Sequence, residues 1–81
     1  MRIDKFLKNA RIIKRRQVAK EACEAGRVLV NDKIAKPGTE VEAGDVISIQ
    51  FGTQRFSAKI LATPEHVKKE DAMLLYEEYE Q

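Results

Sequence analysis

Apolar residues near the start of the chain recur with the period of an amphipathic helix. The positions that follow the i, i+3, i+4, i+7 spacing are Ile3, Phe6, Leu7 and Ala10. This spacing predicts a short helix over residues 3–10. The β-branched pair Ile12 and Ile13 then weakens helix continuation, so we expect a connector over residues 11–14.

A second apolar arc predicts another helix, from about Arg15 to Ala25. Gly26 follows directly, and glycine commonly ends a helix because it adopts a left-handed backbone at no steric cost. The residues expected to be buried are Val18, Ala19, Ala22 and Ala25. Because most of them are alanines, a neighbouring element is expected to approach closely, while Arg16 and Lys20 project from another face of this helix.

After Gly26 the apolar residues recur every second position, which is typical of strands. A hairpin is expected from a strand over 27–30, a turn at Asn31-Asp32 and a return strand over 33–35. Further strands are predicted over 46–51 and 54–62, with a brief one at 40–42. The turns that separate them are predicted at Pro37-Gly38, Gly44-Asp45 and Gly52-Thr53.

The last nineteen residues return to a helical spacing. Thr63-Pro64-Glu65 resembles a helix start, and the apolar positions that follow are Ala72, Leu75, Tyr76 and Tyr79. The order of elements predicts an α+β fold, with two short N-terminal helices packed on a small twisted antiparallel sheet and a C-terminal acidic helix. We therefore expect a domain over 1–62 and an acidic helix over 63–81, docked on its own sheet near Phe56 or Ile60.

The chain is short enough for one domain only. It has 81 residues, no Trp, and no apolar run near the ~20 residues that a membrane span needs, so no membrane contact is expected. Its one cysteine, Cys23, cannot form an internal disulfide, which favours a reducing cytoplasm. Because the chain starts at Met1 without a secretory signal, we expect a complete small cytoplasmic protein.

The net charge of +2 conceals a strong separation of charge along the chain. Residues 1–36 carry eleven Lys or Arg and four Asp or Glu, whereas residues 37–81 carry four and nine. The densest run comprises Arg2, Lys5, Lys8, Arg11, Lys14, Arg15, Arg16 and Lys20. A solvated face is the simpler interpretation. Few acids interrupt the run, however, and it gathers at the start of the second helix, whose dipole favours anions, so nucleic-acid binding is expected.

Residues that carry catalysis are sparse. Cys23 and His66 lie 43 positions apart and do not form a zinc site, and no glycine motif for phosphate binding occurs. We therefore expect no catalytic residue, metal or cofactor, and predict that the protein is not an enzyme. Aromatic residues are also few in the basic region, so phosphate and shape contacts should dominate over base stacking.

Five short motifs, in this order, resemble the RNA-binding domain of the ribosomal protein S-four type. They are Arg2-Ile3-Asp4-Lys5-Phe6-Leu7, Arg16-Gln17-x-Ala19, Gly26-Arg27-Val28-x-Val30-Asn31, Pro37-Gly38 and Gly44-Asp45-x-Ile47. The resemblance spans roughly residues 1–50 and implies structured RNA as the ligand, although Asp32 stands where that family commonly has Gly. The RNA-binding residues that we expect are Arg2, Lys5, Lys8, Arg11, Arg15, Arg16, Gln17, Lys20 and Asn31.

Within that family the chain is most similar to small ribosome quality-control factors, and it also resembles the fifteen-kilodalton heat-shock protein. This resemblance implies a cytoplasmic, ribosome-associated monomer that binds large-subunit rRNA and peptidyl-tRNA on stalled, split large subunits. It would stabilise the P-site tRNA while an RqcH-type factor adds C-terminal alanines.

Three alternatives stay open at this point. One is a general rRNA-binding factor for ribosome recycling or assembly, and another is the detached RNA-binding domain of an RNA-modifying enzyme. The third, a DNA-binding helix-turn-helix protein, is disfavoured because residues 11–14 lack the glycine that such turns often contain.

Overall fold

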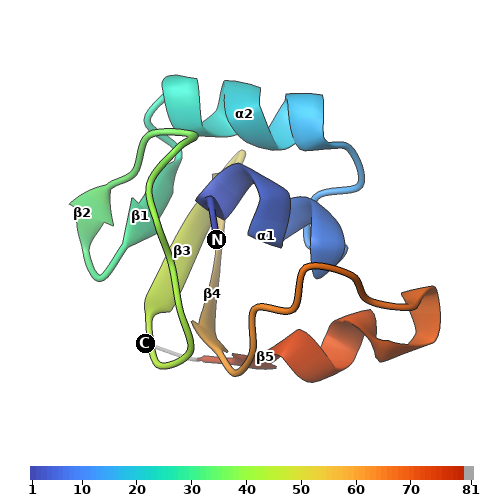
Figure 1. Ribbon diagram of the computed structural model, residues 1–81. Helices are drawn as coiled ribbons and strands as arrows, with labels where there is room; N and C mark the ends of the chain where they lie inside the picture. Colours follow the sequence, from blue (N-terminus) through green and yellow to red (C-terminus); the bar gives the residue numbers. More distant parts are fainter. Residues whose placement is uncertain (80–81) are drawn as a thin grey trace.

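The structure, a computed structural model that describes residues 1–79, places two helices over one face of a five-stranded antiparallel sheet (Figure 1). The helices are α1 (Ile3–Asn9), α2 (Arg16–Glu24) and a 3-10 helix, η1 (Lys69–Leu75). The strands are β1 (Val28–Val30), β2 (Lys33–Ile34), β3 (Val46–Phe51), β4 (Gln54–Ile60) and β5 (Tyr76–Glu78). They lie in the order β2-β1-β3-β4-β5, and the predicted α+β class is confirmed.

The start of α1 is fixed by a distant segment of the chain. Among the described residues no side chain caps this helix; instead, the backbone amides of Ile3 and Asp4 donate to the carbonyls of Thr39 and Pro37, at 2.8 and 3.3 Å. Helix N-termini leave such amides without intrahelical partners, so these two bonds replace a side-chain cap. The predicted strand at 40–42 is reduced to a single bridge between Arg2 and Glu40.

The face that α2 presents to the core differs from the prediction. Ala19 and Cys23, one turn apart, are buried, whereas Val18 is 48% exposed and Ala25 is exposed at the C-cap. The predicted burial of Val18 and Ala25 is wrong because an arc of small apolar residues spans two adjacent faces of a short helix. The smaller pair faces inward and lets α2 pack closely, which leaves the bulkier Val18 on the flank.

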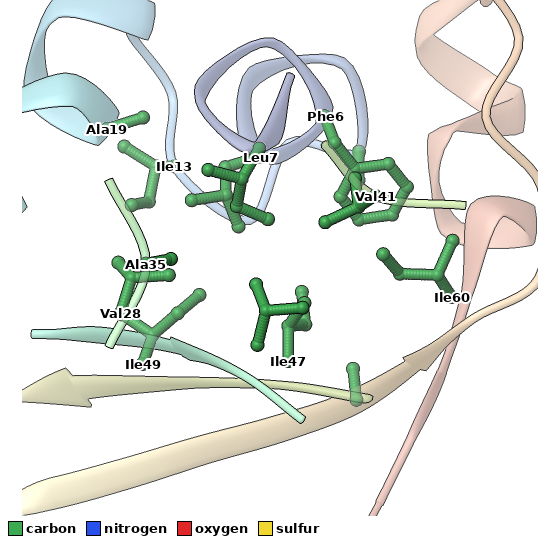
Figure 2. Packing of buried hydrophobic residues seen from close by; sticks show 14 of the residues in the cluster. Phe6, Leu7, Ile13, Ala19, Val28, Ala35, Val41, Ile47, Ile49 and Ile60 are labelled. Carbon is green, nitrogen blue, oxygen red and sulfur yellow. The ribbon is translucent and has the colours of Figure 1, made fainter. Parts of the chain in front are cut away.

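The core lies between α1 and the sheet (Figure 2). Phe6 and Leu7 from α1 meet Ile47 and Ile49 from β3 and Ile60 from β4, and all five are fully buried. Ile47 and Ile49 lie two positions apart on β3, so both side chains face the helices, although Ser48 between them is also buried. Burying side chains of this size contributes about 1.5–3 kcal/mol each, which makes this cluster the main source of stability.

The hairpin between β1 and β2 turns at Asn31 and Asp32, as predicted. Both residues have positive φ angles, 51° and 68°, which is the conformation of a tight two-residue hairpin turn. The Asn31 side chain accepts a hydrogen bond from the Val46 amide at 3.0 Å and donates one to Asp45 at 3.1 Å. Asn31 therefore fastens the hairpin to the start of β3.

The predicted C-terminal acidic helix is wrong. Residues 63–68 form no helix, η1 is a 3-10 helix, and β5 pairs with β4 through Ala58↔Glu78 and Ile60↔Tyr76. A helix of this length is marginal in water, whereas the edge of β4 offers unsatisfied backbone groups that β5 hydrogen-bonds.

The tail does dock on its own sheet as expected. The rings of Phe56 and Tyr76 meet edge to face at 5.9 Å. Ala72 and Leu75 are both buried because the three-residue period of a 3-10 helix places them on one side. Residues of the tail therefore extend the sheet and its core rather than forming a separate helix.

Candidate nucleic-acid interface

Asp4 is a buried carboxylate at the start of α1. Its side chain is 3% exposed and accepts the Lys5 backbone amide at 2.8 Å. It also accepts two hydrogen bonds from Arg2, from Nε at 3.2 Å and from Nη2 at 3.0 Å, and one from Arg16 at 3.4 Å. A buried charge is costly unless it is paired and hydrogen-bonded, and Asp4 meets both conditions.

The two arginines on Asp4 are anchored at one side and open at the other. The Arg2 and Arg16 side chains are 48% and 46% exposed, although each guanidinium contacts the buried carboxylate. A guanidinium has five N–H donors in a planar fork, so donors remain on each residue after Asp4 is satisfied. Asp4 thereby orders two cations that still face outward, and the group keeps one net positive charge.

A shallow hollow of about 290 Å³ opens at this ion-pair group. We call it the arginine hollow, and the residues that line it are Arg2, Asp4, Arg16, Gln17 and Lys20. It brings together four of the nine predicted RNA-binding residues from two separate helices. Planar guanidinium groups with a nearby ammonium suit the oxygens of a phosphate group.

Lys5 and Asn31, which the sequence placed in the RNA-binding set, have partners inside the protein. Lys5 forms an ion pair with Glu65, and this hydrogen bond lowers the pKa of the Glu65 carboxyl. The side-chain amide of Asn9 donates to the carbonyls of Pro64 and Glu65, at 3.4 and 3.3 Å. Lys5 therefore helps to hold the tail against α1, and Asn31 holds the hairpin as described above.

The other three predicted residues lie outside the arginine hollow. Lys8 is exposed on α1, Arg11 is exposed just after this helix, and Arg15 is the exposed N-cap of α2. Arg11 has a φ of 57°, a conformation that favours glycine at the end of a helix. These side chains widen the basic surface without entering the hollow.

Sequence reasoning missed a second concave site, between α2 and the β3–β4 hairpin. This groove, of about 400 Å³, is lined by Phe51 of β3 and Val18 of α2, with Lys14 and Arg27 among its other lining residues. Phe51 continues the two-residue spacing of Ile47 and Ile49 but is 45% exposed. The sequence did contain one indication of this exposure. Phe51 directly precedes the turn at Gly52, so its side chain could lie beyond the part of the sheet that the helices cover.

The one thiol of the chain, Cys23, is buried in the protein. Burial raises the pKa of the Cys23 thiol to about 11, with smaller contributions from Asp4 and Glu24, so the thiolate is scarce at neutral pH. Residues 1–79 contain no group of three or more His, Cys, Asp or Glu that could hold a metal ion. The same part of the chain has no helix long and apolar enough to cross a membrane.

Comparison with known proteins agrees with this architecture. A family model for the S4 domain matches residues 1–47. The chain is 52% identical to the RQC P-site tRNA stabilizing factor of Halalkalibacterium halodurans, over 95% of this chain and 88% of that protein. The corresponding factor of Listeria monocytogenes is 53% identical, over 94% of this chain and 83% of that protein.

Solved structures include a similar fold. The trimeric structure of Vibrio cholerae Heat Shock Protein 15 superposes with a TM-score of 0.88 at 32% identity, covering 98% of this chain and 81% of that one. The matched residues 1–47 contain Asp4 and every lining residue of the arginine hollow. The chain therefore belongs to the S4 domain family and, within it, to the family of RQC P-site tRNA stabilizing factors.

Proposed function

We propose that this protein is a non-catalytic RNA-binding factor of ribosome quality control that stabilises tRNA in the P site of the large ribosomal subunit. The name shared by its relatives supports this role. The arginine hollow also supports it. A site that holds RNA needs ordered cations at the surface and no reacting group, and the hollow offers such cations.

The observation that carries the proposal is the buried Asp4 between two half-exposed arginines. A phosphate in the hollow would accept hydrogen bonds from Arg2 and Arg16, whose side chains are already ordered by Asp4. Ordering before binding reduces the side-chain entropy that is lost when RNA arrives. Lys20 at the rim adds a flexible charge, and Gln17 adds a neutral amide.

The finer role is inferred from the resemblance of the sequence to its family. The factor would act as a monomer on split large subunits that retain peptidyl-tRNA, contacting both rRNA and tRNA. An RqcH-type factor would add alanine residues to the stalled peptide while the tRNA is held. No bond is made or broken by this chain in such a role.

Binding to purified large ribosomal subunits tests the proposal. Subunits with and without peptidyl-tRNA in the P site are sedimented with wild-type protein, Arg16→Ala and Arg55→Ala. Arg55 is the matched control because it pairs across from Gln50, outside the arginine hollow, and is exposed. We expect tighter binding when P-site tRNA is present, and a loss of about 10-fold or more for Arg16→Ala, the usual effect of losing a charged hydrogen bond.

The outcomes separate the remaining roles. Equal binding to both kinds of subunit would favour a general rRNA-binding factor for recycling or assembly. Binding to neither, by folded wild-type protein, would contradict a ribosomal role altogether. Because phosphate contacts release counterions, the affinity of the wild type should also fall steeply as salt rises.

A further inference from the structure

The groove beside Phe51 lies on the flank of α2 away from the arginine hollow. Residues two positions apart on a helix point about 200° from one another, so Val18 faces away from Arg16. The end of the β3–β4 hairpin reaches toward this flank of α2 (Figure 1). We call this site the Phe51 groove; its walls are Ile12 from the connector, Val18 and Ala22 from α2, and Phe51.

The side chains that line the groove leave apolar surface exposed to solvent. Phe51 is 45% exposed and Val18 is 48% exposed, and both line the same groove of about 400 Å³. Single exposed apolar residues are ordinary, but a concave group of them next to polar residues indicates a binding site. The volume lies within the ~300–1,000 Å³ typical of small-ligand pockets, which is large enough for a planar ring.

The polar residues of the groove are suited to a nucleotide. Lys14 and Arg27 supply two positive charges, Gln50 supplies an amide, and none of the acidic residues within 1–79 lines the site. An aromatic face binds a base by stacking, cations bind its flanking phosphates, and an amide can pair with the edge of the base. An acidic peptide would satisfy the cations but would not need a flat aromatic wall.

The groove is also continuous in sequence with the basic surface. Lys14 directly precedes Arg15 and Arg16, so the connector leads from the Phe51 groove to the arginine hollow. We propose that the Phe51 groove receives one unstacked base of the bound RNA, which stacks on Phe51 while Lys14 and Arg27 contact the adjacent phosphates. This inference rests on the proposed function and deepens it, because it adds base stacking to phosphate contacts.

Base stacking was not expected because Phe6, in the basic region, fills the core. The stacking residue comes instead from the acidic half of the chain, which β3 brings beside α2. A loop or bulge in the RNA would present such a base, whereas a regular duplex would not.

The test uses large ribosomal subunits carrying P-site tRNA and four variants, Phe51→Ala, Phe51→Leu, Phe51→Tyr and Arg16→Ala. We expect Phe51→Ala and Phe51→Leu to bind about 5- to 100-fold more weakly, and Phe51→Tyr to bind like the wild type, since stacking needs an aromatic ring. Because Phe51 is half-exposed, thermal melting should show all Phe51 variants folded. A photoreactive phenylalanine at position 51 should cross-link to an RNA nucleotide.

Two results would overturn the proposal. One is Phe51→Leu binding as tightly as the wild type, because leucine has no aromatic face for stacking. The other is a cross-link from position 51 to a protein, which would assign the groove to a protein side chain. Arg16→Ala separates this failure from failure of the proposed function. If Arg16→Ala is defective while the Phe51 variants bind normally, only the base-stacking inference fails; if the wild type itself does not bind subunits, the proposed function fails.

Discussion

The basic and acidic halves of the chain are separated in sequence but interlocked in space. In residues 1–36 the cations dominate, and their buried acid, Asp4, orders two of them. In residues 37–81 the acids dominate, and several act on the first half. Glu40 pairs with the N-terminal amino group at 2.8 Å, Glu65 pairs with Lys5, and Asp45 accepts a hydrogen bond from Asn31.

The difference shows how a small protein selects which charges face a ligand. Acids of the second half engage the start of the chain, the flank of α1 and the hairpin. The cations of the arginine hollow are instead held by an acid of their own half, at half exposure. The acidic half thus acts as a support for the basic half, and the following changes would break or sharpen this division of roles.

The largest expected effect is a loss of stability, caused by a change in the acidic half of the chain. Leu75→Ala removes a buried side chain where η1 joins β5, and large-to-small changes in a core cost about 2–5 kcal/mol in the free energy of unfolding. Met73→Ala is the matched control, because Met73 is 76% exposed on the same 3-10 helix. Urea denaturation should separate the two variants, and low-salt RNA affinity of folded Leu75→Ala should match that of the wild type. Equal stability of both variants would show that η1 is not part of the core.

The next effect, on RNA binding, is expected in the basic half of the chain, at the arginine hollow. Asp4→Asn removes one negative charge, so a site that depended only on net charge would bind RNA more tightly. We expect the opposite, a loss of about 10-fold, because Arg2 and Arg16 lose their common anchor. Stability should fall by about 1–3 kcal/mol, because a charged hydrogen-bond acceptor is lost in a buried site. Salt-dependent RNA binding at fixed temperature measures the first effect, and tighter binding would contradict the role given to Asp4.

A smaller effect on stability is expected at the turn of the β1–β2 hairpin. Asp32 has a φ of 68°, which glycine adopts without strain. Asp32→Gly should therefore raise the free energy of unfolding by about 0.5–1 kcal/mol, while Asp32→Ala should lower it. Thermal denaturation of both variants checks the sign. A stabilised Asp32→Ala would show that the turn is not strained.

The smallest effect is expected at the contact between Lys5 and Glu65. Because the pKa of Glu65 is lowered in the folded protein, its contribution to stability is present above the ordinary pKa of a glutamate and is lost as pH falls through the lowered value. Glu65→Gln should thus melt slightly below the wild type near neutral pH and equally with it in acid. Glu42→Gln, another exposed acid of the same half, serves as the control. A difference that persists in acid would exclude the ion pair as its cause.

The sequence predicts the elements that have a strong period and misses those set by tertiary contacts. The spacing of Ile3, Phe6 and Leu7 correctly predicts α1, and alternation correctly predicts β3 and β4. The tail was misassigned because Tyr76 satisfies a helical spacing as well as it satisfies pairing with Ile60, and only the open edge of β4 decides between them. Local periodicity does not contain that information.

The candidate site was predicted in part for the same reason. Charge and motif pointed to Arg2, Arg16, Gln17 and Lys20, which line the arginine hollow. They could not show that Lys5 pairs with a residue sixty positions away, or that Phe51 emerges beside α2. These contacts depend on how the strands of the second half of the chain pack beneath the N-terminal helices.

The capping of α1 by residues 37–39 sets an order of events during synthesis of the protein. The basic run leaves the ribosome first, but the amides of Ile3 and Asp4 have only water as an acceptor until Pro37 and Thr39 follow. Contacts between such distant segments form late, because the intervening chain must first close into a loop. A half-made chain is therefore a flexible cationic peptide, which meets RNA through charge alone. The ordered pair of arginines, and any selectivity that depends on it, belongs to the chain only after its middle segment has been translated.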